Sequence, residues 1–217
     1  MKKIAARAAV ATLIGATVLS GSAQAALAET TEGPKPTAPA EFAAPEAPQD
    51  TKAEPKADAP KFDLEPTITV SSAKAPGYAG LVAVRAKNVG SEDYFQEFPL
   101  TTFRIDVKTE EGPKGVDRLI TPGWFNGAYT RDLGFDKSTS TRSFEVTLSN
   151  PVNAGDTQLI ANLNFGDGNT KKGRLKNYIT VTQTGRLKED NSEANDQNVD
   201  SREHTLTDGG KKAKGIF

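Results

Sequence analysis

The chain has 217 residues, of which 36% are hydrophobic and 25% are charged, and its formal net charge at pH 7 is −1. This length and composition allow one folded domain and exclude a protein with several membrane spans. The chain has no cysteine and a single histidine, His204. Disulfides and cysteine-ligated metals are therefore excluded, and most metal-assisted or base-assisted catalytic sites lack their usual residues. The charge balance provides no broad basic surface for nucleic acid.

Residues 1–25 have the features of a secretory signal peptide. Basic residues, among them Lys2 and Lys3, precede a short apolar run, which leads to the small-x-small cleavage motif Ala-Gln-Ala at residues 23–25. The apolar run is too short to cross a bilayer comfortably. The alternative is an uncleaved anchor, which would be the protein's only contact with the membrane. We expect a secreted or envelope-associated protein, and the absence of cysteine and of Asn-x-Ser/Thr sites favours a bacterial source.

Residues 26–61 form a linker rich in proline, alanine, glutamate and lysine. Proline removes backbone donors and favours extended polyproline II structure, and the segment has too little apolar mass to offset the entropy of ordering. We expect a disordered spacer between the signal peptide and a folded domain.

From residue 62 the apolar residues recur with a period of two, which predicts strands with one buried and one wet face. The predicted strands are 67–71, 80–89, 102–108, 143–148, 158–165 and 175–184, with a weaker strand at 116–121. One twisted antiparallel sheet cannot bury its apolar face alone, so the pattern predicts an all-β fold, an immunoglobulin-like antiparallel β-sandwich of about seven strands at 62–200. Residues 201–217 are polar and are predicted to form a mobile tail.

Three stretches of this region carry a family resemblance. A strand runs into the Asn-Val-Gly turn at residues 88–90, the sequence Val-Asn-Ala-Gly-Asp-Thr at 152–157 precedes a late strand, and an Asp/Asn-rich stretch follows at 190–195. These features resemble the bacterial CARDB and related surface-repeat families over about residues 66–200. The resemblance implies an adhesive or spacer module on a cell surface, with no catalytic residues. The chain departs from the pattern by its long middle segment, 112–140, and by the lack of a clear final strand.

Trp124, Phe125 and Tyr129 lie in a segment rich in proline, glycine and asparagine. Aromatic rings on a loop present a large contact area to a sugar face or a protein partner, with little rotamer entropy to lose. The three residues are therefore candidate ligand-binding residues. The alternative is that the sole tryptophan fills an open end of the sandwich.

A basic hairpin contains Lys171, Lys172, Arg174 and Lys176. Such a patch attracts phosphate-rich wall polymers or anionic head groups. The alternative is a soluble turn whose lysines protect an exposed strand edge.

The run 189–200 is rich in acids and amides. Calcium takes about six to eight oxygen ligands, and exported proteins meet millimolar calcium, so we consider a weak calcium site with four candidate ligands: Asp190, Asn191, Glu193 and Asp196. The spacing is not that of an EF-hand, because Asn195 takes the position of the required glycine. The alternative is a solvated loop. We expect no other cofactor.

These features favour an exported, non-catalytic β-sandwich protein of the bacterial cell envelope or surface, acting in structure, adhesion or recognition. Its partner would be a cell-envelope polymer or another surface protein. One alternative is a carbohydrate-binding module for wall polysaccharide. A second is a small secreted hydrolase with a carboxylate pair, although no pair stands out among its candidate acids, Asp106, Asp117, Asp132 and Glu145. His204 lies in the predicted tail and is not expected to act as a base.

Overall fold

The computed structural model describes residues 60–71, 80–125 and 127–217. These residues contain twelve strands and one short helix. In chain order they are β1 (Leu64–Val70), β2 (Leu81–Asn88), β3 (Thr101–Glu111), β4 (Thr121–Pro122), β5 (Ala128–Asp136), β6 (Thr141–Leu148), β7 (Thr157–Asn164), β8 (Asn169–Thr170), β9 (Gly173–Arg174), β10 (Lys176–Gly185), β11 (Val199–Asp200), α1 (Ser201–His204) and β12 (Thr205–Thr207). The predicted signal peptide, 1–25, and the predicted linker, 26–61, lie outside the described residues, except for residues 60 and 61. No helix of the described residues is long and apolar enough to cross a membrane.

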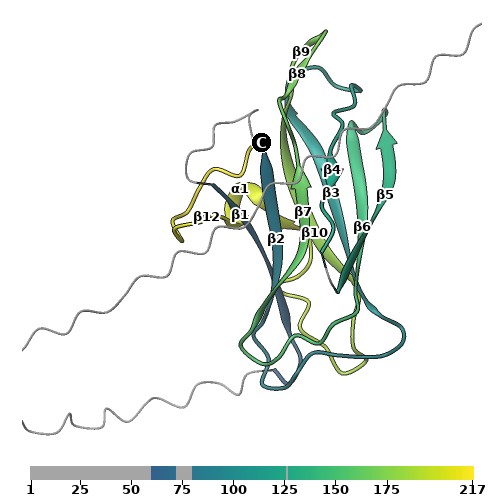
Figure 1. Ribbon diagram of the computed structural model, residues 1–217, viewed down its shortest axis with the longest axis vertical. Coiled ribbons are helices and arrows are strands. Elements are labelled where there is room, and N and C mark those ends of the chain that lie inside the picture. The colour runs from purple at the N-terminus through teal and green to yellow at the C-terminus, as the bar shows by residue number, and fades with distance from the viewer. Residues whose placement is uncertain (1–59, 72–79, 126) are drawn as a thin grey trace, which may run out of the picture. The chain divides into compact units, whose positions relative to one another are not determined.

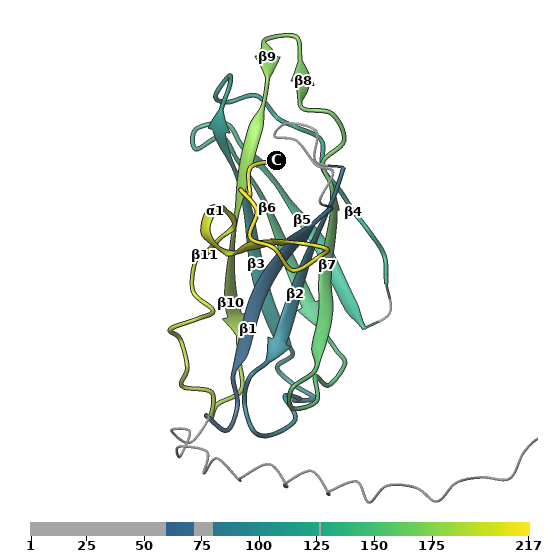
Figure 2. The ribbon, with the colours of Figure 1, turned by 90° about the vertical axis from the view of Figure 1, so that its left-hand side faces the viewer.

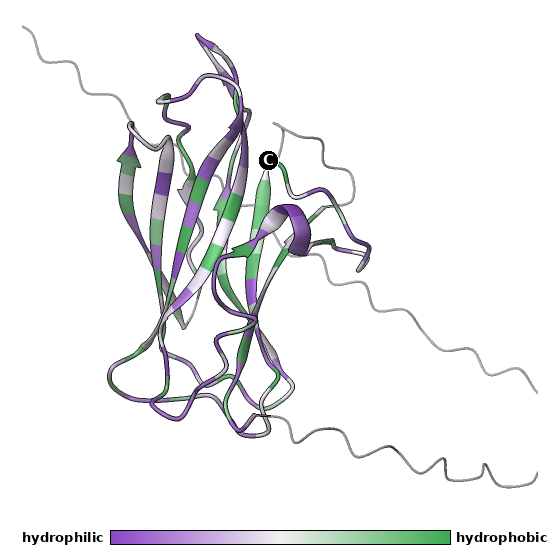
Figure 3. Cartoon of the chain, turned by 180° about the vertical axis from the view of Figure 1, so that it is seen from behind, coloured by the Kyte–Doolittle hydropathy of each residue, from purple (hydrophilic) through white to green (hydrophobic). Residues whose placement is uncertain are grey.

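Two five-stranded sheets form the two layers of a sandwich (Figures 1 and 2). The first has the strand order β12-β1-β2-β7-β4 and the second has the order β11-β10-β3-β6-β5. The longer strands inside the two sheets alternate buried apolar and more exposed polar side chains, as Phe103, Ile105 and Val107 do in β3. Figure 3 shows this alternation along the strands. The inner faces of the two sheets bury one shared core. The predicted all-β sandwich is confirmed.

Six of the predicted strands are confirmed as β1, β2, β3, β6, β7 and β10. The weaker strand predicted at 116–121 is wrong, because only Thr121 of that range belongs to a strand. Arg118 instead turns into the protein, where its Nε donates to the carbonyl of Phe165 at 2.9 Å and its guanidinium lies 5.2 Å from the Phe165 ring centroid. Burial lowers the pKa of Arg118 to about 10, so the side chain stays charged at neutral pH.

Strand β5 lies in the middle segment, at residues for which the sequence predicts no strand. It is an edge strand paired only with β6, and most of its side chains are exposed. Gly134 adopts a φ of +96° beside a bulge in the pairing, a conformation that favours glycine. An edge strand that lies mostly outside the core needs no apolar alternation, which explains why the sequence pattern does not reveal it.

Residues 201–217 are not the mobile tail that their polarity predicts. They form α1 and β12, and β12 pairs in parallel with β1. Phe217 is fully buried, exchanges two backbone hydrogen bonds of 2.7 Å with Asn177, and has its ring 5.3 Å from that of Phe165. Ser201 Oγ donates to the carbonyl of Gly215 and accepts from the backbone N–H of Ile179. The apolar end of the segment therefore anchors it, and the folded body extends to Phe217.

Candidate functional site

Trp124 and Tyr129 form an exposed aromatic pair at the side of the sandwich. Trp124 is 80% exposed and Tyr129 is 52% exposed, with their ring centroids 5.6 Å apart and their planes tilted by 55°. The expectation that the sole tryptophan fills an open end of the sandwich is wrong. Other rings, among them Tyr94, Phe165 and Phe217, take the buried positions.

The backbone around the aromatic pair is attached to both sheets. The N–H of Gly123 donates to the carbonyl of Asn162 in β7 at 2.7 Å, and the N–H of Ser149, just after β6, donates to the carbonyl of Gly127 at 2.9 Å. Phe125 is half-buried and packs against the core. Of the three predicted aromatic residues, Trp124 and Tyr129 thus lie together at the surface, whereas Phe125 packs against the core.

Strand β5 continues from Tyr129 with polar and aliphatic groups. Arg131 forms an ion pair with Glu145 of β6, with Nη2 and Oε1 2.8 Å apart. Leu133 is exposed and, with Arg104 and residues of β5 and β6, lines a shallow hollow of about 340 Å³. The strand therefore offers aromatic, charged and apolar contacts along one edge of the second sheet.

The four acids considered for a hydrolase are all paired with arginines. Asp106 pairs with Arg104, Asp117 and Asp132 pair with Arg142, and Glu145 pairs with Arg131. Ion pairs of this kind are common on exposed sheet faces. The geometry therefore gives the hydrolase alternative no support.

The four residues of the predicted basic patch have different roles. Arg174 pairs with Asp167 at 2.9 Å, and Lys176 pairs with Glu111, where the ammonium lowers the pKa of the glutamate. Lys171 and Lys172 are exposed at the tip of the β8–β9 hairpin. Two of the four cations are thus neutralised by acids, and the hairpin presents two lysines.

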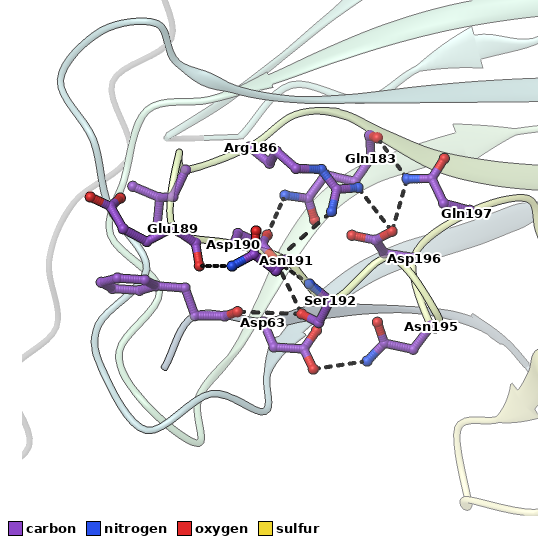
Figure 4. A network of polar contacts seen from close by, with 12 residues as sticks. Asp63, Gln183, Arg186, Glu189, Asp190, Asn191, Ser192, Asn195, Asp196 and Gln197 are labelled. Atoms are coloured by element: carbon purple, nitrogen blue, oxygen red, sulfur yellow. Dashed lines mark hydrogen bonds and ion pairs between the residues drawn. The ribbon is translucent and has the colours of Figure 1, made fainter. Parts of the chain in front are cut away.

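The four residues of the predicted calcium site point in different directions. Asn191 and Glu193 are exposed, whereas Asp190 and Asp196 are buried on either side of Arg186. Arg186 lies 3.8 Å from Asp190 and 3.1 Å from Asp196 (Figure 4). In the described ranges, no three Asp, Glu or His side chains are grouped so that they could hold a metal ion.

Tyr94 completes this buried polar network. Its hydroxyl donates to Asp190 Oδ2 at 2.6 Å and accepts from Gln183 Nε2 at 2.6 Å and from the N–H of Leu187 at 3.1 Å. Burial raises the pKa of Tyr94, as does the bond to Asp190, so the hydroxyl stays protonated and remains a donor. Burial also raises the pKa of Asp196, against the effect of its bonds from Gln197 and Arg186. The polar run 189–200, for which the sequence suggests a solvated loop, therefore packs against the end of the sandwich.

His204 lies at the exposed end of α1. Its Nε2 is 4.0 Å from Glu203, and both side chains are largely exposed. The histidine lines a shallow hollow together with Glu65, Lys212 and neighbouring residues. The imidazole thus lies largely exposed in a shallow hollow.

No known family model matches the chain, and no curated protein matches it. The resemblance to CARDB-like surface repeats therefore stays a prediction. The functional assignment depends on the residues described above.

Proposed function

We propose that the protein is an exported, non-catalytic recognition module of the bacterial cell envelope that binds its partner through Trp124 and Tyr129. One observation carries the proposal: the sole tryptophan is 80% exposed beside a second aromatic ring. Exposed aromatic groups cost free energy in water, and clustered ones are typical of binding sites, where Trp and Tyr provide much of the binding energy.

The N-terminal sequence supports export and a position away from the membrane. The basic and apolar leader and its Ala-Gln-Ala motif have the pattern of a signal peptide, and the Pro/Ala-rich segment that follows suits a spacer. A disulfide-free domain with its own core needs no oxidative help to fold outside the cell. A module placed at the end of a spacer is suited to contact a polymer or a surface protein.

Wall polysaccharide is the ligand that the aromatic pair favours. Sugar rings present apolar C–H faces that stack on aromatic rings, and their hydroxyls need polar partners nearby. Arg131, two residues along β5 from Tyr129, and its partner Glu145 supply such groups. A carbohydrate-binding role is therefore the more specific form of the proposal.

Tryptophan fluorescence tests the proposal directly, because Trp124 is the only emitter of its kind. Titration with soluble wall polysaccharide should change the emission to saturation. Tyr129→Ala should weaken binding by about thirtyfold or more, since truncating a binding hot spot costs at least ~2 kcal/mol. Leu119→Ala, which truncates another exposed apolar residue outside the aromatic pair, should bind normally. Unchanged emission with every wall fraction, together with no retention of the protein on isolated cell walls, would refute the proposed function.

A further inference from the structure

The buried network around Arg186 contains four side-chain oxygens that accept no hydrogen bond from the described residues; one is the amide oxygen of Gln183, and the other three lie close together in sequence or contact one another. Asp63 Oδ1, Asn195 Oδ1 and Asp196 Oδ2 are buried and accept no hydrogen bond from the described residues. Asp63 is 5% exposed and Asp196 is 0% exposed. A buried carboxylate oxygen without a donor is strongly unfavourable, so these side chains indicate a missing positive partner.

The buried charges of the network are also unbalanced. Asp63, Asp190 and Asp196 contribute three carboxylates, and Arg186 is the guanidinium that pairs with two of them. Asp190 is well satisfied, because Tyr94 donates to one of its oxygens and the backbone and side chain of Ser192 donate to the other. One guanidinium thus faces three carboxylates. Asp63 forms no ion pair with Arg186, and the second oxygen of Asp196 accepts no hydrogen bond, so a cation beside these two groups would balance the remaining negative charge.

The hydrogen bonds of the network orient the three oxygens. Asn195 Nδ2 donates to Asp63 Oδ2 at 3.2 Å, which fixes the direction of the amide and leaves its oxygen beside the same carboxylate (Figure 4). The other oxygen of Asp196 is held by Arg186 at 3.1 Å and by Gln197 at 2.9 Å. Asn195 is half-buried, so the group lies close to the surface and an ion could reach it.

We propose that Asp63, Asn195 and Asp196 bind a calcium ion. Carboxylate and amide oxygens are the ligands of hard cations, and calcium tolerates an irregular set completed by backbone carbonyls and water. Two carboxylates and one amide make a weak site, with a dissociation constant of about 10⁻⁴–10⁻³ M, the range of extracellular modules. Of the four calcium ligands that the sequence predicts, this site contains only Asp196. The site involves neither Trp124 nor Tyr129, so the proposal is independent of the proposed function.

Thermal unfolding of the purified protein in calcium chloride and in EDTA tests the site. About 5 mM calcium should raise the Tm by roughly 3–6 °C relative to EDTA, because a ligand that binds only the folded state stabilises it. The shift should titrate in the range of about 10⁻⁴–10⁻³ M. Magnesium should produce a smaller shift, since it dehydrates reluctantly and demands regular octahedral geometry. Equal Tm values in calcium and EDTA would overturn the proposal, and would mean that a buried water satisfies these oxygens.

Asp63→Asn distinguishes a lost site from a lost fold. The variant should lose the calcium-dependent shift, yet in EDTA it should be at least as stable as the unsubstituted protein, because a neutral amide costs less to bury than an unpaired carboxylate. Asp136→Asn, an exposed substitution at the end of β5, should keep the full shift. A full calcium shift in Asp63→Asn would also overturn the proposal.

Discussion

At the scale of single residues, Arg186 is the cation that balances two buried carboxylates. It pairs with Asp190 and Asp196, whose side chains are fully buried, while its own side chain is 18% exposed. Arg186→Met would leave both carboxylates in the interior without their cation. We expect a loss of about 3–5 kcal/mol in the free energy of unfolding, measured by urea denaturation.

Arg104→Met provides the matched control for that prediction. Its ion pair with Asp106 lies on the outer face of the second sheet, with half of the arginine side chain exposed. Exposed pairs of this kind contribute at most about 1 kcal/mol. Similar losses in the two variants would contradict the role given to Arg186.

Single residues were also the hardest features to predict from the sequence. The sequence offered the aromatic residues as candidates, but sequence alone does not distinguish an exposed tryptophan from a buried one. The exposure of Trp124 depends on other rings, among them Phe165 and Phe217, occupying the core. Asp190 and Asp196 look like solvated acids in a polar run. Their burial depends on Tyr94 and Arg186, which lie elsewhere in the chain and form the network only after folding.

At the scale of elements, alternation predicted the central strands and failed at the edges. In β3, Phe103, Ile105 and Val107 face the core while Arg104 and Asp106 face outward, so the period of two is complete. Strand β5 has one neighbouring strand and little core to face, and β12 has only three residues. Such elements form because their backbones pair with neighbouring strands. This pairing does not require alternating apolar and polar residues, so the sequence pattern does not predict these strands.

The charged side chains of β5 protect an open sheet edge. Arg131 and Asp132 lie on this strand beside the bulge at Gly134, and charges and bulges both hinder pairing with another chain. Arg131→Val should therefore aggregate faster than the unsubstituted protein, as followed by light scattering below the Tm. Arg104→Val, on the central strand β3, should aggregate at the normal rate. Equal rates for both variants would contradict edge protection.

The C-terminal segment is a structural element of the core, and Phe217 is its anchor. The ring is fully buried against Phe165, and the backbone pairs with Asn177. Phe217→Ala should lower the free energy of unfolding by about 3–5 kcal/mol, the cost of removing a buried phenylalanine side chain, measured by urea denaturation. Lys214→Ala, an exposed neighbour, should change stability by less than about 0.5 kcal/mol. An unchanged free energy of unfolding in Phe217→Ala would contradict this role and would favour the mobile tail that the sequence predicts.

At the scale of the whole molecule, one core joins both sheets and the C-terminal segment. We therefore expect residues 62–217 to unfold in a single cooperative transition, with equal calorimetric and van't Hoff enthalpies. Hydrogen exchange should show the amide of Phe217, bonded to Asn177, as slow as the amides of β10. Rapid exchange at Phe217 with protection elsewhere would show that the segment opens independently of the sandwich.

The parallel pairing of β1 with β12 sets the order in which a newly made chain can fold. Residues 64–70 leave the ribosome long before residues 205–207, so β1 lacks its outer neighbour until those later residues have been made. Contacts this distant in sequence form late and slow the folding of a nascent chain. If the protein is exported as proposed, this delay favours an unfolded chain during passage through a translocation channel, and residues 205–207 complete the first sheet only after they emerge on the far side.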